Sequence, residues 1–86
     1  MAAVEIYTRD LCGYCVRAKK LLERKGAAFV EYNASRDSTF RKEMIQRSGR
    51  TTFPQIFIGA SHVGGSDELA ALERSGKLDA ALEAAR

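Results

Sequence analysis

Apolar residues follow two different spacings along the chain, and each spacing predicts one kind of element. Alternation with polar residues, or a short apolar run, is typical of a strand. We therefore expect strands over residues 4–8, 29–32, 55–58 and 62–64. The run at 55–58 is apolar at almost every position, which favours a strand that is buried on both faces.

Spacings of three and four residues predict the helices. The first, expected from Tyr14 to Lys25, places Cys15, Ala18, Leu21 and Leu22 on one face. The other helical faces consist of Phe40, Met44, Ile45 and Ser48, of Leu69, Leu72 and Glu73, and of Leu78, Ala81, Leu82 and Ala85. The predicted order is β-α-β-α-β-β-α-α in one domain over residues 1–86. The first two strands should be parallel and the last two antiparallel, which gives a mixed four-stranded sheet.

The composition limits the class of protein. With 86 residues, of which 45% are hydrophobic and 29% charged, the chain is ordinary for one small globular domain. It has no apolar run of about 18 residues, so we expect no membrane span. Its start lacks the basic region, apolar stretch and cleavage site of a secretory signal, so we expect a cytoplasmic protein.

The net charge of +3 is unevenly distributed. Residues 1–50 contain eleven Lys or Arg against six Asp or Glu, whereas residues 51–86 contain three against five. The first part should therefore attract anions. Aromatic residues are few, and none is interleaved with a basic cluster as single-strand binding requires, so we expect no nucleic-acid partner.

Two cysteines, Cys12 and Cys15, are the main candidates for chemistry. Cys12 is expected where a strand ends and a helix begins, and the unpaired N–H groups and positive dipole end of a helix start favour a thiolate. Such positions lower the pKa of a cysteine, and the thiolate is the nucleophile. Cys15 lies about one turn away, so its sulfur can displace a group attached to Cys12 and close a disulfide. Arg9 and Arg17 would add positive potential nearby.

Three other interpretations of the pair are open. A tetrahedral zinc site needs four ligands, and the chain has two cysteines and one histidine unless a dimer completes the site. A purely structural disulfide would restrain the unfolded chain little across so small a loop, and a reducing compartment would open it. The cysteines could also be core residues, although burial is expected to be difficult for Cys12 at the helix tip.

Two further motifs bear on the same chemistry. Thr52-Phe53-Pro54 contains the only proline, which either starts a strand or follows a cis peptide bond. A cis bond would leave the backbone groups of Phe53 free to pair with an extended peptide beside Cys12. Gly64-Gly65-Ser66-Asp67 starts a helix with Ser66 as the expected cap, and this start is either an ordinary cap or an anion-binding site.

Together these motifs resemble those of the glutaredoxin family, in particular its bacterial dithiol members of the glutaredoxin-3 kind. The matching segments cover nearly the whole chain in order and comprise residues 4–8, 12–15, 48–58 and 62–69. The resemblance implies an α/β protein with the thioredoxin fold, in which a four-stranded mixed sheet of order 2-1-3-4 is flanked by helices. It also implies a thiol–disulfide oxidoreductase that uses glutathione to reduce protein disulfides and protein–glutathione mixed disulfides.

The resemblance assigns residues to a glutathione groove. The expected groove residues are Arg9, Tyr14, Arg41, Thr52, Phe53, Pro54, Gly65, Ser66 and Asp67. Phe53 would pair through its backbone with the cysteinyl part of glutathione. Ser66 and Asp67 would hold the γ-glutamyl end, with Asp67 paired to its ammonium group. Arg9 and Arg41 would meet the glycine carboxylate.

Three positions depart from the commonest family pattern. Gly13 replaces proline between the thiols, Phe53 replaces valine before the proline, and Ser66 replaces a frequent cysteine. Because some glutaredoxins without the active-site proline bind an iron–sulfur cluster, one alternative is a [2Fe-2S] carrier in which Cys12 of two subunits and two glutathiones share the cluster. In the leading interpretation no metal is required, and Cys12 attacks while Cys15 resolves.

The remaining alternatives concern the reductant and the partners. A thioredoxin reductase could replace glutathione as the source of electrons, although Ser66, Asp67 and the basic residues favour glutathione. The sequence does not identify the protein substrate, and ribonucleotide reductase is a candidate from the resemblance alone. We expect the protein to act as a monomer.

Overall fold

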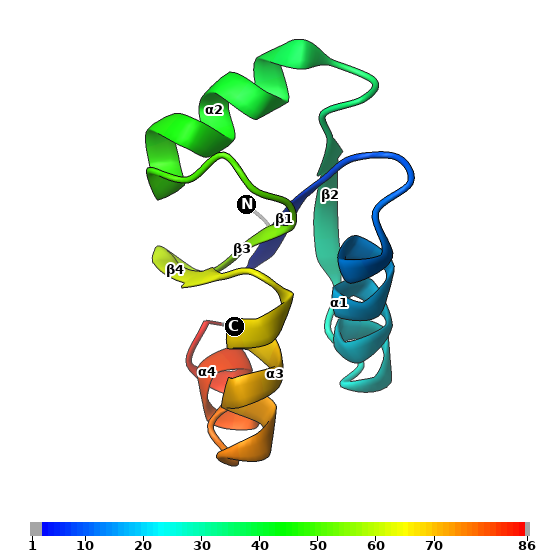
Figure 1. Ribbon diagram of the computed structural model, residues 1–86. Helices are drawn as coiled ribbons and strands as arrows, with labels where there is room; N and C mark the ends of the chain where they lie inside the picture. The colour runs from blue at the N-terminus through cyan, green and yellow to red at the C-terminus, as the bar shows by residue number, and fades with distance from the viewer. Residues whose placement is uncertain (1–2, 86) are drawn as a thin grey trace.

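The computed structural model describes residues 3–85, and its centre is a four-stranded sheet (Figure 1). The strands are β1 (Val4–Thr8), β2 (Phe29–Asn33), β3 (Gln55–Ile58) and β4 (Ser61–Gly64), in the order β2-β1-β3-β4. β1 and β2 are parallel, whereas β3 is antiparallel to both β1 and β4. The expected mixed sheet and its order are therefore confirmed.

Within the described residues 3–85, four helices connect or follow the strands. They are α1 (Gly13–Arg24), α2 (Ser38–Ser48), α3 (Ser66–Arg74) and α4 (Leu78–Ala84). The order of elements agrees with the prediction, and α1 starts and ends one residue earlier than expected. Asp37 caps α2 by accepting a hydrogen bond from the Thr39 N–H (2.9 Å). Within residues 3–85, no helix is both long enough and apolar enough to cross a membrane.

The two faces of the sheet pack against different helices (Figure 1). Because neighbouring strand residues point to opposite faces, Val4 and Ile6 of β1 belong to a core cluster with residues of α1, α3 and α4, whereas Tyr7 packs in a cluster with Met44 of α2. The larger core cluster consists of Val4, Ile6, Ala18, Leu21, Leu22, Ile56, Ile58, Leu69 and Leu78. The smaller core cluster consists of Tyr7, Met44 and Phe57. All four residues of β3 are buried, as expected for a strand with neighbours on both sides.

Antiparallel pairing brings three separated chain segments to one edge of the sheet. Tyr7 near the end of β1 pairs with Gln55 at the start of β3. Gly64 at the end of β4 pairs with Ile56 of β3. The segments that follow β1, precede β3 and follow β4 therefore lie beside one another. These segments carry the cysteines, the proline motif and the start of α3, so the topology gathers all three motifs.

Candidate active site

The start of α1 carries the two cysteines. Cys12 is the N-cap residue, with an extended backbone (φ −121°, ψ 101°), and its carbonyl oxygen accepts the first helical hydrogen bond from the Val16 N–H (3.1 Å). The Cys12 Sγ atom is joined to Cys15 in a disulfide and accepts a hydrogen bond from the Cys15 N–H (3.1 Å). A donor aimed at this sulfur would stabilise negative charge on it after reduction.

Both cysteines are buried in this oxidised state. Cys12 is 7% exposed and Cys15 is 2% exposed. The expectation that burial would be difficult at the helix tip is therefore wrong for this state. The disulfide turns the Cys12 side chain toward α1, and the Phe53 carbonyl oxygen lies 4.0 Å from its sulfur. Cys12 nevertheless keeps the greater exposure of the two, so an incoming thiol reaches it more readily than Cys15.

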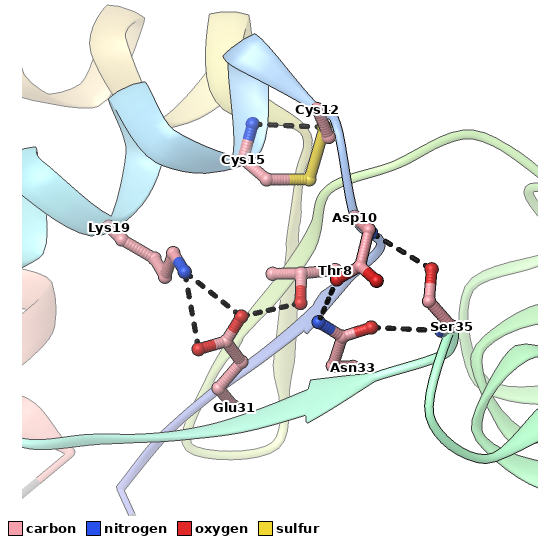
Figure 2. A network of polar contacts seen from close by, with 8 residues as sticks. All are labelled: Thr8, Asp10, Cys12, Cys15, Lys19, Glu31, Asn33 and Ser35. Carbon is pink, nitrogen blue, oxygen red and sulfur yellow. Dashed lines mark hydrogen bonds and ion pairs between the residues drawn. A yellow bond between two sulfur atoms is a disulfide. The ribbon is translucent and has the colours of Figure 1, made fainter.

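Hydrogen bonds from the end of β2 hold the loop that leads to Cys12 (Figure 2). The Asp10 N–H donates to Ser35 Oγ (2.9 Å), and the Asn33 side-chain amide donates to the Asp10 carboxylate (3.0 Å). The Ser35 N–H donates in turn to Asn33 Oδ1 (2.8 Å). The position of the first cysteine is thus fixed by residues more than twenty positions further along the chain.

A second part of this network joins α1 to β1 and β2 beside the disulfide. Glu31 accepts hydrogen bonds from Thr8 Oγ1 (2.6 Å) and from Lys19 Nζ (3.0 and 3.3 Å). Burial raises the pKa of Glu31, but the hydrogen bonds from Thr8 and Lys19 outweigh it and hold the pKa below its usual range. Lys19 and Glu31 line one pocket together with both cysteines. Sequence reasoning assigned no role to this pair.

The loop before β3 presents its backbone to Cys12. The Phe53–Pro54 peptide bond is cis, as one of the two interpretations of Pro54 predicted. The Gln55 side-chain amide donates to the carbonyl and hydroxyl oxygens of Thr52 (3.0 and 3.1 Å), which fixes the loop. The Phe53 ring packs against the smaller core cluster, while its carbonyl oxygen lies beside the Cys12 sulfur.

A pocket of about 220 Å³ lies between this loop, the start of α1 and the start of α3. Its lining consists of Tyr14, Arg50, Thr52, Phe53, Pro54, Gly65, Ser66, Asp67 and Glu68. Seven of the nine residues expected to form a glutathione groove belong to this lining. The fold therefore gathers most of the predicted groove around one hollow, and Phe53, one of its lining residues, places its carbonyl oxygen 4.0 Å from the Cys12 sulfur.

Arg9 and Arg41, the other two expected groove residues, do not line this pocket. The Arg9 guanidinium donates to the carbonyl oxygens of Asp10 (3.2 Å) and Leu11 (3.4 Å), on the loop before Cys12. Arg41 is exposed on α2. Their contact with the glycine carboxylate of glutathione stays a prediction.

The N-cap of α3 is Gly65 and not Ser66, which corrects the expectation. The Gly65 N–H donates to Glu68 Oε1 (2.6 Å), which is the hydrogen bond that the N3 side chain makes in a capping box, and no side chain caps the helix in the way expected of the serine hydroxyl. A Cβ atom on Gly65 would lie 3.3 Å from the Pro54 carbonyl oxygen, and this close approach favours glycine. Ser66 is the first helical residue and is buried.

Sequence reasoning also missed Arg50 and Glu68 as residues of the pocket. Glu68 stands three positions after Gly65, the spacing of a capping box, which is a usable signal. Arg50 pairs with the Glu68 carboxylate at 3.1 Å, and no short-range pattern predicts that contact. The Gly65 N–H and the Arg50 guanidinium hold the pKa of Glu68 below its usual range.

These groups suit thiol–disulfide exchange beside a charged ligand. Because Glu68 occupies the Gly65 N–H, the backbone N–H groups of Ser66 and Asp67 are the ones that remain for a ligand carboxylate at the helix start. The Asp67 carboxylate lines the same pocket and can accept from an ammonium group. The pocket thus offers partners of both signs next to a sulfur that can be attacked.

Comparisons with known proteins agree with this site. The glutaredoxin family profile matches residues 4–63. Glutaredoxin 3 of Escherichia coli is 55% identical over 83 residues, which cover 96% of this chain and 100% of that protein. The solution structure of glutaredoxin from Brucella melitensis is 59% identical, with a TM-score of 0.84, and the match covers 100% of this chain and 94% of that chain.

A third comparison reaches a plant protein. The crystal structure of a buckwheat glutaredoxin–glutathione complex is 30% identical to this chain, with a TM-score of 0.90. That match covers 98% of this chain and 79% of the buckwheat chain. With a matching family profile, a bacterial relative over its full length and the paired cysteines at the start of α1, the chain belongs to the glutaredoxin family of thiol–disulfide oxidoreductases with the thioredoxin fold.

Proposed function

We propose that this glutaredoxin reduces protein disulfides and protein–glutathione mixed disulfides, with glutathione as its reductant. The observation that carries the proposal is the pocket of about 220 Å³, which joins the Phe53 loop and the start of α3 beside the Cys12 sulfur. The similarity to the buckwheat protein that was solved with glutathione supports the same ligand.

The cysteinyl and γ-glutamyl parts of glutathione have partners of suitable chemistry in the pocket. The backbone of Phe53 pairs with the cysteinyl residue and directs its sulfur toward Cys12. The N–H groups of Ser66 and Asp67 receive the γ-glutamyl carboxylate, and the Asp67 carboxylate binds the ammonium group. Tyr14 covers the side of the pocket that is formed by α1.

Mixed disulfides are reduced through Cys12 alone. The Cys12 thiolate attacks the glutathione sulfur of the substrate, a new sulfur–sulfur bond forms, and the substrate leaves as a thiolate that takes a proton from water. The thiolate of a second glutathione then attacks the glutathione sulfur bound to Cys12. This step releases oxidised glutathione and restores the Cys12 thiolate, so each turnover consumes one glutathione thiol, and the glutathione of the substrate leaves as the other half of the oxidised glutathione.

Protein disulfides need both cysteines. Cys12 attacks one sulfur of the substrate, and Cys15 then attacks the Cys12 sulfur and releases the second substrate thiol. The product is the Cys12–Cys15 disulfide seen in this structure. Two glutathiones reopen it, the first by attack on the more exposed Cys12. The proposed setting is the reducing cytoplasm, and ribonucleotide reductase is one candidate substrate that consumes such electrons.

Two variants test the proposal in an assay in which glutathione reductase and NADPH report oxidised glutathione. Cys12→Ser should abolish turnover of a glutathionylated protein and of a protein disulfide. Cys15→Ser should keep most of the first activity and lose the second. Equal loss of the first activity in both variants would contradict the route through Cys12 alone. Equal turnover with a thioredoxin reductase in place of glutathione would contradict the proposed reductant.

A further inference from the structure

Among residues 3–85, four large apolar side chains are exposed, and three of them flank the disulfide. Leu11 is 99% exposed, Tyr14 57% and Val16 48%, whereas the fourth, Val30, lies on β2. We call Leu11, Tyr14 and Val16 the cysteine-flanking patch. Scattered apolar side chains are ordinary on a surface, but three beside a nucleophile form an area that a second molecule can cover.

The patch extends from the glutathione pocket across the disulfide. Tyr14 lines the glutathione pocket, whereas Leu11 and Val16 line a separate pocket with both cysteines. When a glutathionylated protein is bound, its glutathione occupies the first pocket. The polypeptide on the other side of the mixed disulfide then lies nearest to Leu11 and Val16.

Leu11 is an unfavourable residue for the fold at its position. Its φ of 55° makes it the only residue other than glycine in the left-handed region among residues 3–85. That region is disfavoured for a leucine, whereas glycine and asparagine adopt it readily. The fully exposed side chain gains no burial in return. A strained and exposed leucine directly before the attacking cysteine therefore suggests a contact that forms only with a substrate.

Guanidinium groups border the patch. The Arg9 guanidinium donates to the Leu11 carbonyl oxygen (3.4 Å), and the Arg17 Cζ atom lies 5.4 Å from the centre of the Tyr14 ring. The nearest acidic side chains already have partners, since Asp10 binds Asn33 and Glu31 binds Lys19. An occupant with an apolar side chain and carboxylates would match this surface in both polarity and charge.

We propose that Leu11 determines the choice of protein substrate: it contacts an apolar side chain next to the reactive cysteine of an acidic segment, while Arg17 attracts the carboxylates. This inference rests on the proposed function, because the substrate is a glutathionylated or disulfide-bonded protein. Leu11 takes no part in the thiol–disulfide exchange at Cys12. It changes only the affinity for the polypeptide that carries the leaving thiol.

The test compares three substrates in the coupled assay. Two are glutathionylated peptides of equal length, one with Leu and Asp beside its cysteine and one with Ser and Asn there. The third is the cysteine–glutathione disulfide, which has no side chains to contact the patch. Wild type should prefer the Leu/Asp peptide over the Ser/Asn peptide by about fivefold in kcat/KM, the size expected for one partly covered leucine.

Leu11→Asn should reduce this preference to the part that Arg17 contributes at low salt, should remove it at high salt, and should leave the turnover of the other two substrates unchanged. Because asparagine suits the left-handed backbone, the melting temperature should stay the same or rise, which separates lost contact from lost fold. Leu11→Met should keep the preference. Val30→Asn, at an exposed apolar site on β2, is the matched control and should change nothing. Arg17→Gln should lower the preference at low salt and have little effect at high salt.

The outcomes separate this inference from the proposed function. A wild type that does not turn over the cysteine–glutathione disulfide with glutathione refutes the proposed function. If wild type turns it over but does not distinguish the peptides, or if Leu11→Asn keeps the full preference at high salt, the inference is wrong. An equal loss on all three substrates in Leu11→Asn also overturns it, because Leu11 would then act by shaping the loop before Cys12.

Discussion

The Sγ atom of Cys12 lies 4.0 Å from the carbonyl oxygen of Phe53, although 41 positions separate the two residues along the chain. Antiparallel pairing of β1 with β3 sets this distance, because it places the start of β3 beside the end of β1. The ring of Phe53, unlike its carbonyl group, packs against the smaller core cluster. Backbone and side chain of this residue therefore serve ligand binding and stability separately.

Phe53→Val should lower the free energy of unfolding and leave glutathione binding nearly unchanged. The ring is only partly buried, so we expect a loss of about 1 kcal/mol in a denaturant titration. The KM for glutathione should change by less than about twofold, because the backbone makes the contact. A tenfold rise in KM with unchanged stability would show instead that the ring forms part of the binding surface.

Asp67→Asn should weaken the binding of glutathione. Asparagine keeps the shape but loses the charge that the ammonium group requires, so the KM for glutathione should rise about fivefold at an exposed site of this kind. The matched control is Glu23→Gln, which removes a carboxylate near the end of α1 that lies away from Cys12, and it should leave the KM unchanged. An unchanged KM in Asp67→Asn would remove Asp67 from the proposed site.

The architecture was predictable because it follows from regular spacings and short connections. Alternation at Val4, Ile6 and Thr8 identified β1, and the apolar run from Gln55 to Ile58 identified β3. The handedness of the first βαβ unit and the tight turn before β4 limited the sheet to few arrangements. The position of the cysteines at the start of α1 followed from the same pattern.

The predictions that were wrong, and the site residues that were missed, depend on contacts that local sequence patterns do not show. The N-cap of α3 is Gly65, whose N–H donates to the Glu68 side chain, and local propensity does not decide between Gly65 and Ser66 as the cap. The burial of Cys12 depends on the loop at Phe53. Lys19 and Glu31 resemble solvated charges until the fold places them beside the disulfide.

Ser35→Ala should loosen the loop before Cys12 in a way that hydrogen exchange can detect. The Ser35 hydroxyl is the acceptor for the Asp10 N–H, so its removal should speed exchange of that amide by about fivefold, the equivalent of roughly 1 kcal/mol. The Ala34 N–H, which donates to the Thr8 carbonyl oxygen (2.8 Å), is an internal control and should keep its rate. Equal acceleration at both amides would indicate global destabilisation.

Acid should weaken the start of α3 through Glu68. Its pKa in the folded protein is held below the ordinary value of 4.5 by the Gly65 N–H and the Arg50 guanidinium. The unfolded chain therefore binds a proton more readily, so the stabilisation is complete above pH 4.5 and is lost as the pH falls through the lower, folded value. Because the Glu68 side chain is 46% exposed, we expect an effect below about 1 kcal/mol.

Comparing the stability of wild type with that of Glu68→Gln separates the titration of Glu68 from the titration of the other acidic side chains. Glutamine can accept from Gly65 but cannot titrate or pair with the Arg50 charge, so the variant should be less stable than wild type at pH 6. The difference should shrink as the pH falls through the lowered pKa of Glu68 in the folded protein, because the wild-type carboxylate then becomes protonated. Denaturant midpoints measured from pH 3 to 6 give this difference directly. A gap that stays constant across the range would mean that Glu68 contributes through its shape and not through its charge.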